Sequence, residues 1–336
     1  MKQISVVILN WNGAAMMRRF LPSVVKCSPE ADIVVADNAS TDDSLQMLAD
    51  EFPEVKTVVF DKNYGFAEGY NRALESITTP YVLLLNNDVE VTPSWLQPLL
   101  TFMDSHPEAA ACQPKLLSES QRDRFEYAGA CGGFIDWLGY PYCRGRLFSE
   151  VEQDQGQYDE PLSVFWATGA ALLIRTALYK EVGGLDARFF AHQEEIDLCW
   201  RLKSRGHTIW CIPQSTVYHV GGGTLNQSNP RKTFLNFRNN LLMLYKNLPQ
   251  GELQYVLIWR YFLDHLAALK MLLTGQADEA RAVRQARREF NRISNQFEAD
   301  RQRNIHSATV ENIPEIHRSS LLWAFYGLRK RKYSQL

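Results

Sequence analysis

The chain has 336 residues and lacks any clean hydrophobic run long enough to cross a membrane. Its most apolar stretch, residues 253–273, is interrupted by charged side chains, which favours an amphipathic helix or a helix packed between others. The apolar run at the N-terminus covers only residues 4–9 before Asn10, too short for a secretory signal peptide. These absences predict a cytoplasmic protein.

Closely spaced cysteine pairs are also missing. The chain has six cysteines but no Cys-x-x-Cys, so we expect reduced thiols, as in the cytosol. The net charge of −2 argues against nucleic acid or another polyanion as a partner. With 46% hydrophobic residues, the chain can bury one large core or two smaller ones. The cysteines are Cys27, Cys112, Cys131, Cys143, Cys199 and Cys211.

Apolar runs that stop on polar residues are the most informative feature that is present. Residues 81–85 are all apolar, which predicts a strand covered on both faces, as in parallel sheets. Residues 4–9 and 32–36 have the same character. Ligands of open α/β sheets bind at the carboxyl ends of strands. A single Asp there is usually a turn former, but several consecutive ends carry amides or acids: Asn10 and Asn12, Asp37 and Asn38, and Asn86, Asn87 and Asp88.

The order of these segments predicts an α/β fold. One helix over residues 14–27 separates the first two strands, which makes a βαβ unit with a right-handed crossover. A helix starting at Ser44 and a strand over residues 55–60 follow. We therefore expect a mostly parallel sheet covered by helices, with further helices in the C-terminal third.

Short motifs continue this pattern along residues 8–222. They are Ile8–Gly13, Asp37–Ser40, Asn63–Asn71, Leu85–Val89, Gly169–Arg175, Val182–Asp186, Phe189–Arg201 and Tyr218–Gly222. In this order they resemble the inverting family 2 glycosyltransferases, in particular the rhamnosyltransferase-like branch of bacterial surface polysaccharide synthesis. Each motif alone is weak, but the ordered set is specific and spans about residues 3–245.

The resemblance implies the glycosyltransferase A fold, in which a nucleotide-sugar-binding half and an acceptor-binding half share one sheet. Residues 1–115 and 116–245 would form these halves, and residues 246–336 a C-terminal helical region with a basic tail. It also implies the reaction of a metal-dependent hexosyltransferase. A sugar would move, with inversion, from a nucleoside diphosphate sugar to a hydroxyl of a glycan or lipid-linked glycan in cell-surface polysaccharide synthesis.

The resemblance also implies residues for donor binding. Asp37 matches the family residue that contacts the base or ribose, and Trp11 is a candidate for stacking on the base. Further nucleotide-sugar candidates are Asn10, Asn63, Gly65, Asn71, Asn87 and Arg238.

A metal site is implied at Asp88, the last residue of the family's Asp-x-Asp-like triplet. Asn86 and Asn87 occupy the earlier positions, and amides offer a cation less charge, so Mg²⁺ or Mn²⁺ would be held mainly by Asp88 and phosphate oxygens. His219 matches a position that often binds the metal or the diphosphate, and Gly221–Gly223 would permit close approach to a phosphate. Alternatively, His219 is an ordinary satisfied core or surface residue.

The catalytic base is implied within the pair Glu194 and Glu195. Alignment through Asp197–Arg201 places the base on Glu195, one methylene longer than the family's usual Asp. A buried carboxylate with a raised pKa can take the proton of an acceptor hydroxyl. Alternatively, both acids only favour the positive end of a helix that starts near Glu194.

Three further segments have more than one interpretation. The insert at 118–161 is rich in aromatics and glycine, and would either stack on sugar rings beside the acceptor or form a satellite hydrophobic cluster. The pairs Arg231-Lys232 and Arg238-Asn239 would either bind an anion or belong to a solvated helix face. Residues 276–336 are basic, with aromatics beside Arg329–Lys332; they would either contact an anionic membrane or form a packed helical hairpin with a solvated tail.

Alternatives to an active glycosyltransferase follow from the same residues. A nucleotide-sugar pyrophosphorylase would need a basic residue just after the first strand, and Trp11–Ala14 contains none. A non-catalytic sugar-nucleotide or glycan binding protein of this family is the main alternative, because amides replace acids before Asp88 and Glu195 replaces an Asp. The long C-terminal helices could also form a homodimer contact.

Overall fold

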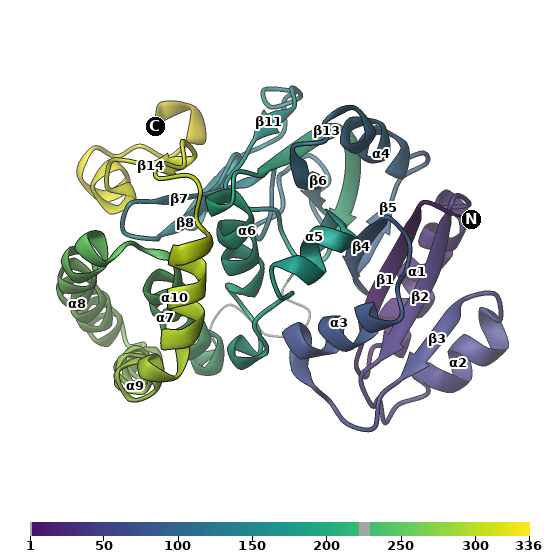
Figure 1. Ribbon diagram of the computed structural model, residues 1–336, viewed down its shortest axis with the longest axis horizontal. Helices are drawn as coiled ribbons and strands as arrows, with labels where there is room; N and C mark the ends of the chain where they lie inside the picture. Colours follow the sequence, from purple (N-terminus) through teal and green to yellow (C-terminus); the bar gives the residue numbers. More distant parts are fainter. Residues whose placement is uncertain (1, 222–228) are drawn as a thin grey trace.

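A central nine-stranded sheet organises the protein (Figure 1). The computed structural model describes residues 2–221 and 229–336; Gly222, Gly223 and Thr224 of the predicted glycine segment lie outside them. The strand order is β11-β13-β6-β12-β4-β1-β2-β3, and β5 pairs with β13. β4, β1, β2 and β3 are parallel, whereas β12 runs antiparallel between β4 and β6. The mostly parallel α/β prediction is therefore confirmed for the N-terminal half.

The N-terminal half alternates strands and helices as predicted. The helix predicted over residues 14–27 has those bounds, and the strand predicted over residues 55–60 is shorter by one residue at each end. The elements are β1 (Ile4–Asn10), α1 (Ala14–Cys27), β2 (Ala31–Asp37), α2 (Ser44–Glu51), β3 (Lys56–Val59), α3 (Gly65–Glu75), β4 (Tyr81–Asn86), β5 (Val89–Val91) and α4 (Leu96–Ser105).

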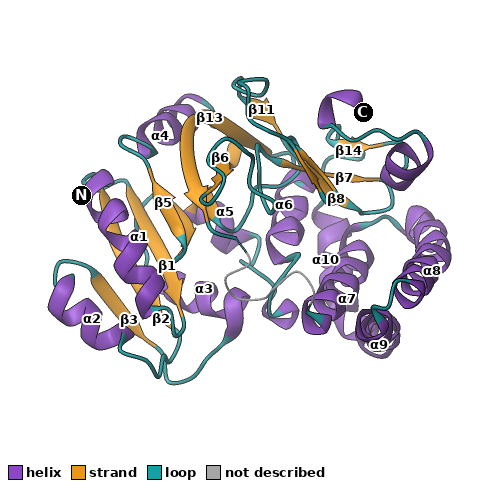
Figure 2. Ribbon diagram, turned by 180° about the vertical axis from the view of Figure 1, so that it is seen from behind, coloured by secondary structure: helices purple, strands orange, loops and turns teal. Residues whose placement is uncertain are grey.

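Strand β4 is buried on both faces, as its unbroken apolar run predicted. Val82 and Leu84 join one hydrophobic cluster, and Leu83 and Leu85 join the other. Alternate side chains of a strand point to opposite faces, so these two clusters are the two layers of core against the sheet. α1, α2 and α4 cover one face, and α3, α5 and α6 cover the other (Figure 2).

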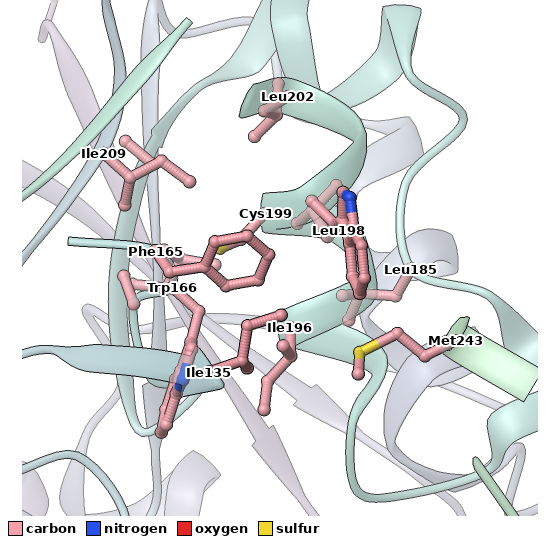
Figure 3. Packing of buried hydrophobic residues seen from close by; sticks show 14 of the residues in the cluster. Ile135, Phe165, Trp166, Leu185, Ile196, Leu198, Cys199, Leu202, Ile209 and Met243 are labelled. Carbon is pink, nitrogen blue, oxygen red and sulfur yellow. The ribbon is translucent and has the colours of Figure 1, made fainter. Parts of the chain in front are cut away.

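The second half of the sheet adds a second lobe, which corresponds to the predicted acceptor-binding half. The strand that ends at His219 is β13, which has an irregularity between Ile212 and Thr216. Helix α6 packs its apolar residues Ile196 and Cys199 toward Phe165 and Trp166 (Figure 3). The elements are β6 (Ala109–Ser118), β11 (Leu162–Ser163), β12 (Ala171–Arg175), α5 (Thr176–Glu181), η1 (Ala187–Phe189), α6 (Glu194–Ser204) and β13 (Thr208–His219).

The insert at 118–161 forms most of a second, five-stranded sheet of order β10-β9-β8-β7-β14. Tyr142 is buried against Phe134, and Trp137 stacks on Tyr255, so these aromatics serve the hydrophobic cluster that was one of the two predicted alternatives. Tyr127 remains exposed. The strands are β7 (Gly133–Asp136), β8 (Pro141–Cys143), β9 (Arg146–Leu147), β10 (Glu150–Val151) and β14 (Ile316–His317).

The C-terminal region packs on this lobe. Helix α7 contains the predicted boundary at residue 245, and β14 joins the second sheet by pairing with β7. Within the described residues, no helix is both long and apolar enough to cross a membrane. The elements are α7 (Pro230–Asn247), α8 (Gln250–Leu273), α9 (Ala277–Ile293), η2 (Ser294–Phe297), α10 (Glu298–Ser307), η3 (Trp323–Gly327) and η4 (Tyr333–Gln335).

Charged residues of α8 lie inside the protein. Arg260 is 2% exposed and Asp264 is 0% exposed. Asp264 accepts from Arg260 at 3.1 Å and from Arg287 of α9 at 2.5 Å, and Arg260 also lies over the ring of Tyr140. A buried charge of this kind is tolerated only when it is paired and hydrogen-bonded. This cluster therefore sets which face of α8 points inward.

We expect Asp264→Ala to lower the free energy of unfolding by about 3–5 kcal/mol, because it leaves two arginines without their buried partner. Chemical denaturation measures this difference. Asp278→Ala, which removes the exposed partner of Arg281, is the matched control and should change stability by less than about 0.5 kcal/mol. Equal effects of the two substitutions would contradict a structural role for the buried cluster.

Candidate active site

The polar ends of β1, β2 and β4 meet at one edge of the sheet. The parallel register places Asn10 beside Asp37 and Leu9 beside Asn86. The Asn10 Nδ2 donates to Asp37 Oδ2 at 3.1 Å, and Asn87 Nδ2 donates to Asn10 Oδ1 at 3.0 Å. Three predicted donor-site residues thus form one connected network.

Glycine is required beside this network. A Cβ on Gly13 would lie 2.3 Å from Asn87 Nδ2 and 2.4 Å from Asn10 Oδ1, so a larger residue would displace both amides. Trp11, two residues earlier, is 49% exposed at the end of β1. Its indole is accessible for the stacking role predicted for it.

A second amide network surrounds the start of α3. Asn38 Nδ2 donates to Asn63 Oδ1 and to the carbonyl of Gly65, both at 3.0 Å. Gly65 has a φ of +77°, and a Cβ there would lie 2.7 Å from the ring of Phe190. Asn63 and Gly65 therefore shape the turn that brings α3 against the loop before α6.

Asn71 lies farther along α3 and is occupied by protein contacts. Its Nδ2 donates to the carbonyl of Leu185, and its Oδ1 accepts from the Tyr179 hydroxyl and the Leu185 amide. These bonds join α3 to the segment of α5 and the loop that follows it. A direct contact of Asn71 with the donor remains a prediction.

Asp88 and His219 come together although 131 positions separate them. His219 Nε2 lies 3.1 Å from Asp88 Oδ1, and His219 Nδ1 lies 3.4 Å from Glu126 Oε1. Burial alone would lower the pKa of His219, but the carboxylates of Glu126 and Asp88 outweigh it and raise that pKa to about 10. Burial opposes ionisation of Asp88, yet its bond to His219 holds its pKa below the usual range.

These residues fit a cation site with few protein ligands. The carboxylate of Asp88 suits Mg²⁺ or Mn²⁺, and His219 could join it as a ligand only where the cation displaces the proton that the raised pKa keeps on the ring. Among residues 2–221 and 229–336, no group of three His, Cys, Asp or Glu side chains is arranged to hold a metal. Oxygens of a bound diphosphate would have to complete the coordination.

The predicted acid pair starts α6. Glu194 is buried and Glu195 is partly buried. Burial raises the pKa of Glu195 to about 7, and burial with the charge of Glu195 raises the pKa of Glu194 well above its ordinary value. In the described part of the chain, one oxygen of each and the Nε2 of His192 are buried without a hydrogen-bond partner. Buried polar atoms without partners are rare, and such a cluster indicates a place for a ligand.

Backbone contacts link the acid pair to the strand ends. The amide of Asn86 donates to the carbonyl of Ala170 at 3.0 Å. A Cβ built on the neighbouring Gly169 would lie 3.9 Å from the Cβ of Glu195. Glu195 therefore lies close to Gly169, and the next residue, Ala170, bonds the end of β4.

The loop before the acid pair has an unusual backbone. Phe190, His192 and Gln193 all have positive φ, between 67° and 72°, which costs energy for non-glycine residues. One side chain of α7 opposes this cost, because Asn239 Nδ2 lies within 3.0 Å of the carbonyls of Phe189, Ala191 and His192. Asn239 thereby positions the start of α6.

The cations predicted near the donor site lie on α7. Arg238 donates to the carbonyls of Arg188 and Phe189, so it supports the same loop as Asn239; its predicted contact with the donor stays a prediction. Arg231 lies over the ring of Phe190. Burial lowers the pKa of Lys232. This part of α7 is not a plain solvated face.

The sequence is similar to a known protein family and to several of its characterised members. The model of the family described as Glycosyl transferase family 2 matches residues 5–183. The chain belongs to glycosyl transferase family 2. It is 26% identical over 233 residues to the N-acetylglucosaminyl-diphospho-decaprenol L-rhamnosyltransferase of Mycobacterium tuberculosis, covering 64% of this chain and 75% of that protein. It is 23% identical over 222 residues to the O-antigen biosynthesis protein RfbC of Myxococcus xanthus, covering 65% of this chain and 17% of that protein.

Solved structures confirm the predicted glycosyltransferase A fold. GalNAc-T7 with UDP, GalNAc and Mn²⁺ superposes with a TM-score of 0.58 at 18% identity, covering 74% of this chain and 49% of that one. Residues 1–349 of S. aureus TarS with UDP-GlcNAc superpose with a TM-score of 0.55 at 17% identity, covering 91% and 89%. The family match and the glycosyltransferase relatives together show that the protein is a glycosyltransferase, as predicted.

Sequence analysis of this glycosyltransferase missed Glu126. Its Oε2 accepts from the amides of Ala128 and Gly129, while Oε1 faces His219. A carboxylate behind a ligand histidine orients the ring and increases its basicity. Glu126 lies within the insert and follows no strand end, so nothing in a single sequence marks it.

We expect Asn239→Ala to lower kcat about 10- to 100-fold, because the loop can relax and move Glu195 by a fraction of an ångström. It should also lower stability by about 1–3 kcal/mol, since three carbonyls lose their donor. Initial rates of sugar transfer and thermal unfolding measure both effects. Gln97→Ala on α4 is the control, because this exposed amide donates to Thr101 within its own helix. A normal kcat in Asn239→Ala would contradict the positioning role.

Proposed function

We propose that this glycosyltransferase is inverting and depends on a divalent metal. It transfers a hexosyl unit from a nucleoside diphosphate sugar to a hydroxyl of a lipid-linked glycan, in the synthesis of a cell-surface polysaccharide. The observation that carries the proposal is the set of buried, unpartnered polar atoms on His192, Glu194 and Glu195, with Glu195 close to Gly169, the residue before the one that bonds the end of β4. The acceptor class is supported by the polyprenyl diphosphate substrate in the name of the mycobacterial relative.

The donor half would hold the nucleotide along the ends of β1 and β2. Trp11 offers an exposed ring for stacking on the base. Asp37 is buried and accepts from Asn10 and from the amide of Ser40, so it would act on the nucleotide by keeping that turn in place or through a small rearrangement on binding. Asn87 extends the same network toward Asp88.

Transfer would be a single displacement. Glu195 takes the proton of the acceptor hydroxyl as its oxygen forms a bond to the anomeric carbon. The bond from that carbon to the diphosphate oxygen breaks, its electron pair leaves with the nucleoside diphosphate, and the configuration inverts. A base with a pKa of about 7 is well matched to this work near neutral pH.

Asp88 and His219 would hold Mg²⁺ or Mn²⁺ together with diphosphate oxygens, and the ion would supply charge neutralisation to the leaving group. Mn²⁺ in the structures of GalNAc-T7 and of the mannosyltransferase PcManGT supports this choice. PcManGT superposes with a TM-score of 0.52 at 11% identity.

Glu195→Gln should lower kcat by about 10²–10⁴-fold, because the amide cannot accept the proton. Nucleotide affinity should stay within about twofold and the melting temperature should not fall, since the amide avoids burying a charge. The assay is release of nucleoside diphosphate with a polyprenyl diphosphate N-acetylglucosamine acceptor. Glu194→Gln is the matched control, with a loss under about tenfold. The reverse ranking would assign the base to Glu194.

The pH dependence of the wild-type reaction is a second test of Glu195 as the base. The base works only when ionised, so kcat/KM should rise through pH 7 and be lost as the pH falls below that value. A profile that is flat from pH 5.5 to 8 would contradict assignment of the base to a buried glutamate.

Thermal unfolding with UDP, dTDP, GDP or CMP, each with and without Mn²⁺ or Mg²⁺, tests donor binding. One nucleotide at about 100 times its Kd should stabilise the protein by about 2.7 kcal/mol, and more strongly with metal. Asp88→Asn should remove the metal-dependent part and leave the remainder. Stabilisation by none of the nucleotides would instead favour a non-catalytic glycan-binding protein.

A further inference from the structure

The outward face of α8 is hydrophobic along almost its whole length. Phe262 is 62% exposed and Leu273 is 79% exposed, although both are large apolar residues. Their neighbours recur every three or four positions, so they form one stripe on the helix. The stripe consists of Tyr255, Ile258, Trp259, Phe262, Leu266, Leu269, Leu272 and Leu273, flanked by Tyr261.

The polarity of α8 is inverted relative to a helix on a soluble protein surface. Arg260 and Asp264 point inward and are fixed there by Arg287, while the aromatic and aliphatic residues face outward. The buried charges prevent the helix from turning its stripe toward the core. A contiguous exposed apolar surface of this size marks a site of contact with a membrane or another protein.

A second segment extends this surface. Residues Trp323, Tyr326 and Leu328, in and beside η3, are all exposed. Lys270 of α8 contacts Tyr326 through its hydroxyl at 3.3 Å and over its ring, so the segment lies against the end of α8. Both lie at the end of the molecule opposite α2 and β3 (Figures 1 and 2).

The charged side chains beside this apolar surface are basic. Basic residues follow the aromatic segment directly, from Arg329 to Lys332, and Lys270 lies between the two parts. Residues 319–336 contain no acidic side chain, and α8, described in full, has only Glu252 at its start besides the buried Asp264. Two copies meeting through this face would find no acids to pair with these bases. An anionic bilayer complements both the apolar stripe and the basic rim.

We propose that the outward face of α8, with Trp323–Lys332, docks on the surface of an anionic lipid bilayer. The aromatic and aliphatic side chains enter the headgroup region, and the basic residues meet lipid phosphates, without any helix crossing the membrane. The inference deepens the proposed function, on which it rests for the reason to dock, because a lipid-linked acceptor is presented at such a surface.

Flotation of the purified full-length protein with vesicles tests the proposal. Vesicles of phosphatidylcholine with about 30% phosphatidylglycerol should carry the protein upward, and vesicles of phosphatidylcholine alone should carry much less. The triple variant W259S/F262S/L266S should lower the partition coefficient roughly 10-fold or more on anionic vesicles. The variant K330Q/K332Q should lower it roughly 20-fold on anionic vesicles and leave neutral vesicles unaffected.

Val59→Ser is the matched control, because Val59 is equally exposed on β3 at the opposite end of the molecule, and its flotation should equal that of the wild type. Thermal unfolding of each variant checks the fold. If the triple variant does not fold, the single substitutions Phe262→Ser and Leu273→Ser replace it, each with a smaller loss in the same direction.

Three results would overturn the proposal. The first is that the wild type fails to float with anionic vesicles. The second is that the α8 variants float as the wild type does. The third is that no form floats and light scattering finds a dimer that W259S/F262S/L266S converts to a monomer, which would assign the face to a second copy of the chain. Flotation needs neither donor nor acceptor. Flotation without sugar transfer therefore contradicts only the proposed function, and transfer in detergent without flotation contradicts only this inference.

Discussion

Parallel pairing of β1 with β2 and β4 is the constraint on which the site depends. A polar side chain inside a strand that is buried on both faces costs free energy unless it is hydrogen-bonded, so most polar groups of these strands collect where the strands end. The register then places Asn10 between Asp37 on one side and the Asn86–Asp88 turn on the other. The second half of the sheet extends this edge, because β13 delivers His219 to Asp88.

The acid pair shows how a scaffold can hold a group in an unfavourable environment. Burial that raises the pKa of Glu195 to about 7 is destabilising for an ionised carboxylate, and positive φ angles in the preceding loop add to the cost. Asn239 offsets part of these two costs by donating to three loop carbonyls, and Arg238 donates to two loop carbonyls. Hydrogen bonds from α7 thus hold the loop before Glu195 in place, which is what the proposed role of this carboxylate as a base requires.

The sequence alone does not predict which face of helix α8 points toward the core. Its composition indicated an amphipathic or interhelical segment, and the usual expectation is that the apolar side faces the core. Instead Arg260 and Asp264 are buried, because Arg287 from α9 and Tyr140 from the second sheet surround them. Partners from distant segments decided which side faces outward, and periodicity within one helix contains no information about them.

Local patterns in the sequence were sufficient to predict β1, α1, the buried strand β4, the start of α6 and the ordered motifs of the family, since these depend on residues close together in the chain. The family resemblance carried by those motifs placed Asp88, Glu195 and His219 as candidates. Only the tertiary structure brought Asp88 to His219, added Glu126 behind it and held the acid loop with Asn239. Each of these contacts joins segments far apart in sequence, and its distance and electrostatic effect exist only once the chain is packed.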